Sequence, residues 1–117
     1  MDTKIVTGKI SKAELEEMAS SSFLDFVKGV ADLEREIIAF GGELHADEEQ
    51  ALLQNGSKQE NLWGFNIFPA KSQEEAIEYT SLINIRPRAG NRGLEIESDE
   101  VRNKIKQIVW KLVDGTN

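Results

Sequence analysis

The chain has 117 residues, of which 39% are hydrophobic and 30% are charged. This balance is typical of a globular protein and excludes wholesale disorder. No apolar run is long enough to cross a membrane, and Met1 is followed by acidic Asp2 without a signal-peptide core, so we expect a cytoplasmic protein. The absence of cysteine excludes disulfides, thiolate metal ligands and a cysteine nucleophile. The length predicts a single domain over residues 1–117.

The net charge is −7, and it is unevenly distributed. Residues 1–60 hold 13 acidic and 6 basic side chains, whereas residues 61–117 hold 8 of each. We therefore expect no general nucleic-acid binding, because neutralising phosphates requires a basic face. A local basic patch in the second half is compatible with this distribution.

The N-terminal part of the chain predicts a short strand followed by a helix. Residues 4–10 are rich in β-branched side chains, which indicates a lead-in or edge strand. Ser11 and Glu14 have the spacing of a capping box, so a helix is expected to begin there. Apolar residues then recur at helical spacing from Leu15 to Phe26.

Two interpretations of residues 26–33 are open, because the end of this helix is not marked. The helix continues through them, or they form a hairpin strand that turns at residues 34–35. Gly29 favours the hairpin, since glycine weakens a helix interior by about 1 kcal/mol. Residues 37–40 form a compact β-type run, and the glycines at 41–42 allow a bulge or the close approach of another group.

The middle of the chain predicts a short helix and two strands. Asp47 is the expected N-cap of a helix that ends at Gly56. Residues 62–68 are expected to form a strand. Residues 77–86 alternate between apolar and polar side chains and predict a second strand, which Pro87 ends. The side chains expected on the apolar face of the first strand are Trp63, Phe65 and Ile67.

The C-terminal segment predicts the clearest helix, over residues 98–113, with Ser98 as its cap. At about 100° per residue, Trp110 falls nearly opposite the apolar stripe of this helix. We therefore expect Trp110 to pack under a loop or to contact a second chain, which makes a homodimer through Trp110 an alternative. The apolar stripe consists of Val101, Ile105, Ile108, Val109 and Leu112.

Together these elements predict an α+β fold. We expect a mainly antiparallel sheet of three to five strands, packed with an N-terminal helix, a C-terminal helix and one short central helix. The sheet is expected to be antiparallel because the connection between residues 69 and 77 is too short for a helical crossover.

The strongest candidate for a ligand site is the end of the 77–86 segment and the loop behind it. Arginine's planar fork suits carboxylates and phosphates, and loop amides near Gly90 add donors. Alternatively, the arginines pair with carboxylates such as Glu95 and Glu97 and hold the loop closed. The expected ligand-binding residues are Asn66, Asn84, Arg86, Asn91 and Arg92.

Glu43 and His45 are a second candidate pair. They are two residues apart, so on an extended chain they point the same way, with Leu44 turned into the core. His45 is the only histidine of the chain, and histidine is the side chain that ordinarily titrates near neutral pH. Glu43, His45 and Arg86 are therefore the candidate catalytic residues for proton transfer at a phosphate without a metal.

The same region offers oxygen ligands for a divalent metal, with Asp47 or Glu49 beside Glu43 and His45. A lone histidine is more often structural, with Asp47 merely capping a helix. We therefore expect no metal site and no cofactor.

Several short sequence motifs between Glu34 and Arg92 resemble those of a known family. That family comprises small bacterial proteins catalogued only as a domain of unknown function. The resemblance extends over most of the chain and implies no activity, substrate or cofactor. Because the polar motifs belong to one family pattern, it favours a single site built from them. The motifs are Gly-Glu-Leu-His-Ala-Asp, Asn-Gly-Ser-Lys-Gln, Leu-Trp-Gly, Ile-Asn-Ile-Arg-Pro and Gly-Asn-Arg.

The sequence therefore predicts a small binding or regulatory domain whose polar cleft takes an anionic small molecule or an acidic group of a protein partner. One alternative is a metal-independent phosphodiesterase or toxin-like ribonuclease that uses Glu43, His45 and Arg86. The acidic N-terminal half disfavours it, because its field opposes the approach of RNA. A purely structural interaction subunit is the other alternative.

Overall fold

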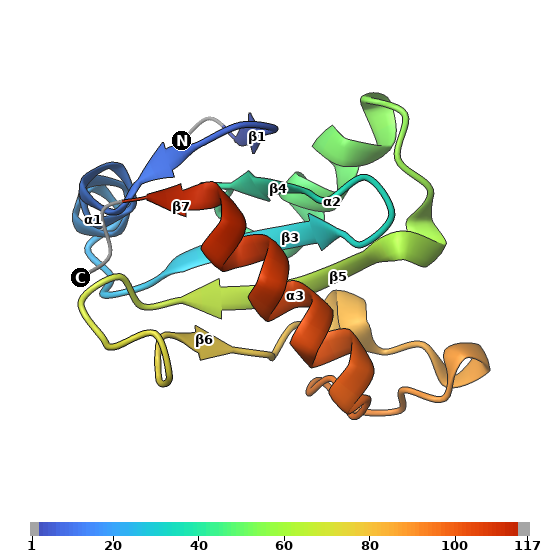
Figure 1. Cartoon of the computed structure of the whole chain (residues 1–117). Helices are drawn as coiled ribbons and strands as arrows, with labels where there is room; N and C mark the ends of the chain where they lie inside the picture. The colour runs from blue at the N-terminus through green and yellow to red at the C-terminus, as the bar shows by residue number, and fades with distance from the viewer. Residues whose placement is uncertain (1–2, 115–117) are drawn as a thin grey trace.

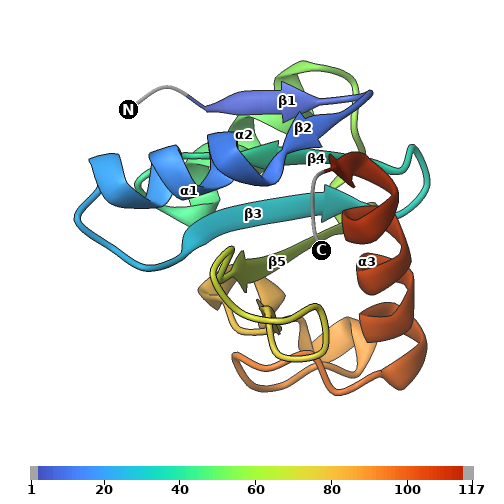
Figure 2. The same ribbon diagram turned by 60° about the vertical axis from the view of Figure 1, so that its left-hand side comes forward.

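The computed structural model describes residues 3–114 and has an α+β architecture, as expected. An antiparallel five-stranded sheet has the order β1-β4-β3-β5-β6. Helices α1 and α3 pack on one face of this sheet and α2 on the other (Figures 1 and 2). The strands are β1 (Lys4–Val6), β2 (Ile10–Ser11), β3 (Val27–Asp32), β4 (Ile37–Phe40), β5 (Leu62–Ile67), β6 (Ile77–Glu78) and β7 (Val113–Asp114). The helices are α1 (Lys12–Ser21), α2 (His45–Gln54) and α3 (Asp99–Leu112), with 3₁₀ turns η1 (Gln59–Asn61), η2 (Leu82–Asn84) and η3 (Pro87–Ala89).

The N-terminal elements follow the sequence prediction only in part, because residues 4–11 contain two short strands and α1 ends at Ser21, before Phe23 and Phe26 of its expected apolar stripe. β1 is the edge strand beside β4, and the Ser11 hydroxyl caps α1 by accepting from the Glu14 amide. β2 leaves this sheet and pairs in parallel with β7. The helix α1 ends in a Schellman motif, in which the Phe23 and Leu24 amides donate to carbonyls of the last turn. Phe23 holds the left-handed position of this motif, with φ of 58°.

Residues 27–32 form a strand, so the hairpin interpretation is confirmed. The Asp32 carboxylate closes the turn by accepting from the backbone amides of residues 34 and 35. Gly29 is required by packing, because a Cβ at this position would lie 2.6 Å from the Phe65 ring. The two faces of the hairpin contribute to two cores, one under α1 and α3 and the other under α2.

The start of α2 differs from the prediction. The helix begins at His45, and Asp47 lies at its third position, where its carboxylate accepts from the Leu44 amide. The prediction that Asp47 is the N-cap was therefore wrong by one turn. Leu44 is 61% exposed rather than turned into the core. The end of the helix is as expected, with Gly56 at φ of 101°.

The prediction of one strand over residues 77–86 was wrong, since only Ile77–Glu78 pairs with β5. After Glu78, the edge of β5 is bound by side chains of the following segment instead of by the backbone of a neighbouring strand. The Asn84 amide accepts from the Gly64 N–H at 2.8 Å and donates to the Gly64 carbonyl at 2.9 Å. The absence of a side chain at Gly64 lets the segment around Ser81 and Asn84 lie this close to β5, because a Cβ at Gly64 would lie 2.6 Å from the Cβ of Ser81. The chain consequently folds into two 3₁₀ turns.

The C-terminal helix α3 confirms its predicted stripe. Ile105 and Ile108 are 0% and 1% exposed, and they pack against the sheet. Trp110 is half-buried and packs against the edge of the core under α1 and α3, and together with Pro69 and Gln73 of the connection between β5 and β6 it lines a small cavity. Trp110 thus packs under a loop of its own chain, the first of the two arrangements expected for it.

Candidate functional site

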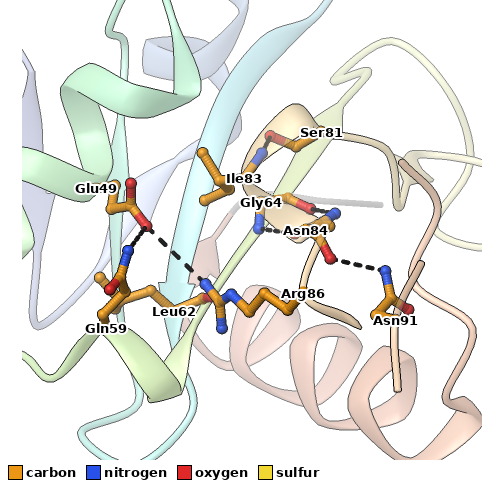
Figure 3. Close-up of polar contacts among 9 residues, drawn as sticks. All are labelled: Glu49, Gln59, Leu62, Gly64, Ser81, Ile83, Asn84, Arg86 and Asn91. Atoms are coloured by element: carbon orange, nitrogen blue, oxygen red, sulfur yellow. Dashed lines mark hydrogen bonds and ion pairs between the residues drawn. The ribbon is translucent and has the colours of Figure 1, made fainter. Parts of the chain in front are cut away.

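Arg86 is held in a fixed position at the edge of β5. Its guanidinium lies 4.7 Å from the Trp63 ring. Its Nη2 donates to the Leu62 carbonyl, and Figure 3 shows the guanidinium between Leu62 and Glu49. The same nitrogen is 4.0 Å from the Glu49 carboxylate of α2. Burial lowers the pKa of Arg86, and the Glu49 carboxylate opposes this shift. Because arginine ordinarily titrates far above neutral pH, the group remains a cation.

An open groove of about 790 Å³ adjoins this guanidinium. Its walls come from α2, η1 and the two 3₁₀ turns between residues 82 and 89. Leu82 and Ile85 are 76% and 43% exposed, so apolar surface faces solvent on the same side as Arg86. The lining residues are Glu49, Gln59, Glu60, Leu82, Ile83, Ile85, Arg86, Pro87, Arg88 and Ala89.

Asn84 and Asn91 form the framework behind the groove and do not line it. Asn84 is fully buried, and besides Gly64 it binds the Leu94 carbonyl at 3.2 Å. The Asn91 amide donates to the carbonyls of Asn84, Gly93 and Glu95, and its oxygen accepts from the Glu97 N–H. Both amides are therefore occupied in holding the loop.

Of the three arginines in this segment, Arg86 and Arg88 line the groove and Arg92 does not. Arg92 is exposed and outside the groove, and its backbone amide binds the Glu97 carboxylate at 3.1 Å. Arg86 pairs with Glu49 rather than with Glu95 or Glu97. Because Leu82–Asn84 is a 3₁₀ turn and Arg86 forms only an isolated bridge with Asn91, Asn84 and Arg86 do not share a strand face.

His45 and Asn66 lie together in a different place, on the α2 face of the sheet. The Nε2 of His45 lies 2.8 Å from the Phe65 carbonyl, and the Asn66 amide donates to the Glu78 carboxylate at 2.9 Å. Burial lowers the pKa of His45, and the Lys28 ammonium adds to this, whereas its hydrogen bonds to Phe65 and Asn66 oppose it. Neither residue lines the groove of Arg86.

Glu43 is exposed and also lies outside the groove. Only a direct parallel pairing of residues 37–44 with residues 77–86 would bring Glu43 beside Arg86, and β3 and β5 separate β4 from β6. His45 and Arg86 bind carbonyls three residues apart on β5, which corresponds to about 10 Å along a strand. Glu43, His45 and Arg86 thus do not line one cleft, and we do not propose the phosphodiesterase.

Sequence reasoning missed Glu48, a buried carboxyl on α2. It is fully buried, accepts from the Gly42 amide at 2.8 Å, and has an Oε1 with no hydrogen-bond partner among the described residues. Burial raises the pKa of Glu48 to about 9, although the Gly42 hydrogen bond and Lys28 lower it. Two signals were available: Glu48 lies one turn before Leu52, and Gly42 leaves room for its side chain.

Residues 3–114 contain no group of three histidine, aspartate or glutamate side chains arranged to hold a metal ion. Within the same range, every helix falls short of the length and apolarity that a membrane crossing requires.

The fold and groove define a small α+β protein with an arginine at the base of a partly apolar surface groove. The chain belongs to the family described as Protein of unknown function (DUF5674), whose model matches residues 4–112. This membership confirms the resemblance expected from the sequence. Neither a curated protein nor a solved structure matches the chain significantly.

Proposed function

We propose that this chain is a small cytoplasmic binding protein whose groove takes a ligand that joins an apolar group to an anion. The observation that carries this proposal is the state of Arg86. Its side chain lines the groove and is 16% exposed, its Nη1 has no hydrogen-bond partner among residues 3–114, and its Nη2 lies 4.0 Å from the Glu49 carboxylate. A buried donor without an acceptor costs free energy, which a ligand's carboxylate, sulfonate or phosphate would recover.

The setting of Arg86 favours recognition of an anion. Stacking on Trp63 and the bond to the Leu62 carbonyl restrict the guanidinium before any ligand arrives, so little conformational entropy is lost on binding. The adjoining apolar side chains supply the other half of the interaction. Leu82 and Ile85 would lose contact with water when an apolar group covers them.

Replacing Arg86 by glutamine is expected to weaken binding of 8-anilinonaphthalene-1-sulfonate, an aromatic anion, by about 10–100-fold, because a charge-assisted hydrogen bond is lost. Fluorescence titration measures the dissociation constant. Arg92→Gln is the matched control, since it removes an exposed arginine outside the groove. Leu82→Glu tests the groove without touching the contacts of Arg86, and a comparable loss is expected. Wild-type affinity in both groove variants would rule the proposal out.

Replacing Glu49 by glutamine is expected to strengthen binding of the same probe by about 2–5-fold. The Glu49 carboxylate competes with the ligand's anion for Arg86, and the amide does not. Glu60→Gln is the control, because it removes one charge from the same groove without removing this ion pair. Equal gains in the two variants would show that general charge, rather than competition for Arg86, sets the affinity.

A further inference from the structure

The connection between α1 and β3 exposes an aromatic ring in a strained backbone position. Phe23 is 97% exposed and has φ of 58°, a conformation that favours glycine. Its amide and that of Leu24 complete the Schellman motif, so the backbone geometry is set by the end of the helix. A glycine would serve this turn better, and an exposed phenylalanine contributes nothing to the core. A residue that is unfavourable on both counts points to a contact outside its own fold.

The neighbours of Phe23 complement the groove of Arg86. Leu24 is 41% exposed and Asp25 is exposed, so an aromatic ring, an aliphatic side chain and a carboxylate follow one another. The groove offers apolar surface beside Arg86 and Arg88 at its η2–η3 wall, whereas its two carboxylates, Glu49 and Glu60, lie on α2 and η1. We infer that residues 23–25 of a second copy of this chain dock in the groove, with the Asp25 carboxylate on the arginines. This inference rests on the proposed function and names the partner of that site.

The fold keeps the loop away from the groove of its own chain. Val27, where β3 begins after the loop, pairs with Ile67, whereas Asp32 at the other end pairs with Leu62, whose carbonyl binds Arg86. Five residue-to-residue steps separate these ends, which corresponds to about 17 Å of strand. In Figure 1 the connection after α1 and the orange segment that carries η3 lie at opposite ends of the molecule.

Docking between copies is therefore head to tail. One copy contributes the loop and the other the groove, so each dimer retains a free loop and a free groove and grows into a ring or an open chain. Because three residues bury little area, the association belongs to the weak class, with dissociation constants of about 10 μM to 1 mM.

Sedimentation velocity of the full chain, at concentrations from about 10 μM to about 1 mM, tests this association. We expect the wild type to show reversible growth beyond the monomer. Phe23→Gly and Leu82→Glu should each remain monomeric, because one lacks the anchor and the other carries a charge on the groove wall. Phe23→Gly should also raise the melting temperature by about 3–6 °C at low concentration, which verifies that it folds.

An equimolar mixture of the two variants distinguishes head-to-tail docking from other contacts. The Leu82→Glu chain retains its loop and the Phe23→Gly chain retains its groove, so the mixture is expected to form a dimer that cannot grow. Persistent association of either variant alone, or a mixture that stays monomeric, would overturn the inference. A wild type that stays monomeric while it binds the anilinonaphthalene sulfonate through Arg86 would overturn the inference and leave the proposed function intact. A wild type that does not bind the anilinonaphthalene sulfonate would instead count against the proposed function.

Discussion

Replacing Asn84 by alanine is expected to destabilise the protein by about 3–5 kcal/mol. The substitution removes three hydrogen bonds, two to Gly64 and one to the Leu94 carbonyl, in a fully buried position. The Gly64 N–H and carbonyl then lose their partners at the edge of β5. Each unsatisfied buried polar group costs about 1–3 kcal/mol, so the effect exceeds that of an ordinary polar deletion.

Urea denaturation followed by circular dichroism measures this loss. Asn103→Ala is the matched control, because it removes an exposed asparagine from the surface of α3 and is expected to change stability by less than about 0.5 kcal/mol. A similar free energy of unfolding for both variants would show that Asn84 does not replace a strand at this edge.

Replacing Glu48 by glutamine is expected to stabilise the protein by about 2–4 kcal/mol at pH 7.5 and to leave it nearly unchanged at pH 4.5. Burial raises the pKa of Glu48 to about 9 in the folded state, whereas the ordinary value is 4.5. Between these values the unfolded chain releases a proton that the folded chain retains. Wild-type stability therefore falls as the pH rises through this window, by up to about 1.4 kcal/mol per pH unit.

Glutamine removes this dependence, because its amide does not ionise and its carbonyl can still accept from the Gly42 amide. Free energies of unfolding measured from pH 4.5 to pH 9 give the slope directly. Glu16→Gln, at an exposed position on α1, removes the same formal charge and serves as the control. Identical slopes in the wild type and in Glu48→Gln would contradict a buried, protonated Glu48.

The candidate site shows where local patterns stop being informative. Sequence reasoning selected Arg86 because it lies among other arginines and polar residues. Its actual partners, Trp63 and Glu49, lie more than twenty residues away on β5 and α2. Asn84 and Asn91 drew attention for the same polarity, yet their amides hold the backbone of the loop. A polar side chain in a sequence does not reveal whether its partner is a ligand or a buried peptide group.

The alternation over residues 77–86 failed for a related reason. Ile77 and Tyr79 pack against the core under α1 and α3, whereas Ile83 packs against the core under α2. The period-two pattern of apolar residues thus belongs to a chain that crosses between two cores, not to one face of a strand. The side chain of Asn84 binds the N–H and the carbonyl of Gly64, so these groups need no partner from a neighbouring strand.

The elements determined by the sequence itself are those whose signals are local. The cap of α1 at Ser11, the hairpin over 27–40 and the stripe of α3 all depend on residues within a few turns of each other, and they formed where expected. The motifs that resemble the family are also recognised from the sequence alone. Only the tertiary structure decided that Glu48 is buried, that Arg86 stacks on Trp63, and that Glu43 and His45 lie outside the groove. These outcomes depend on strand order and on contacts between distant elements, which neighbouring residues do not encode.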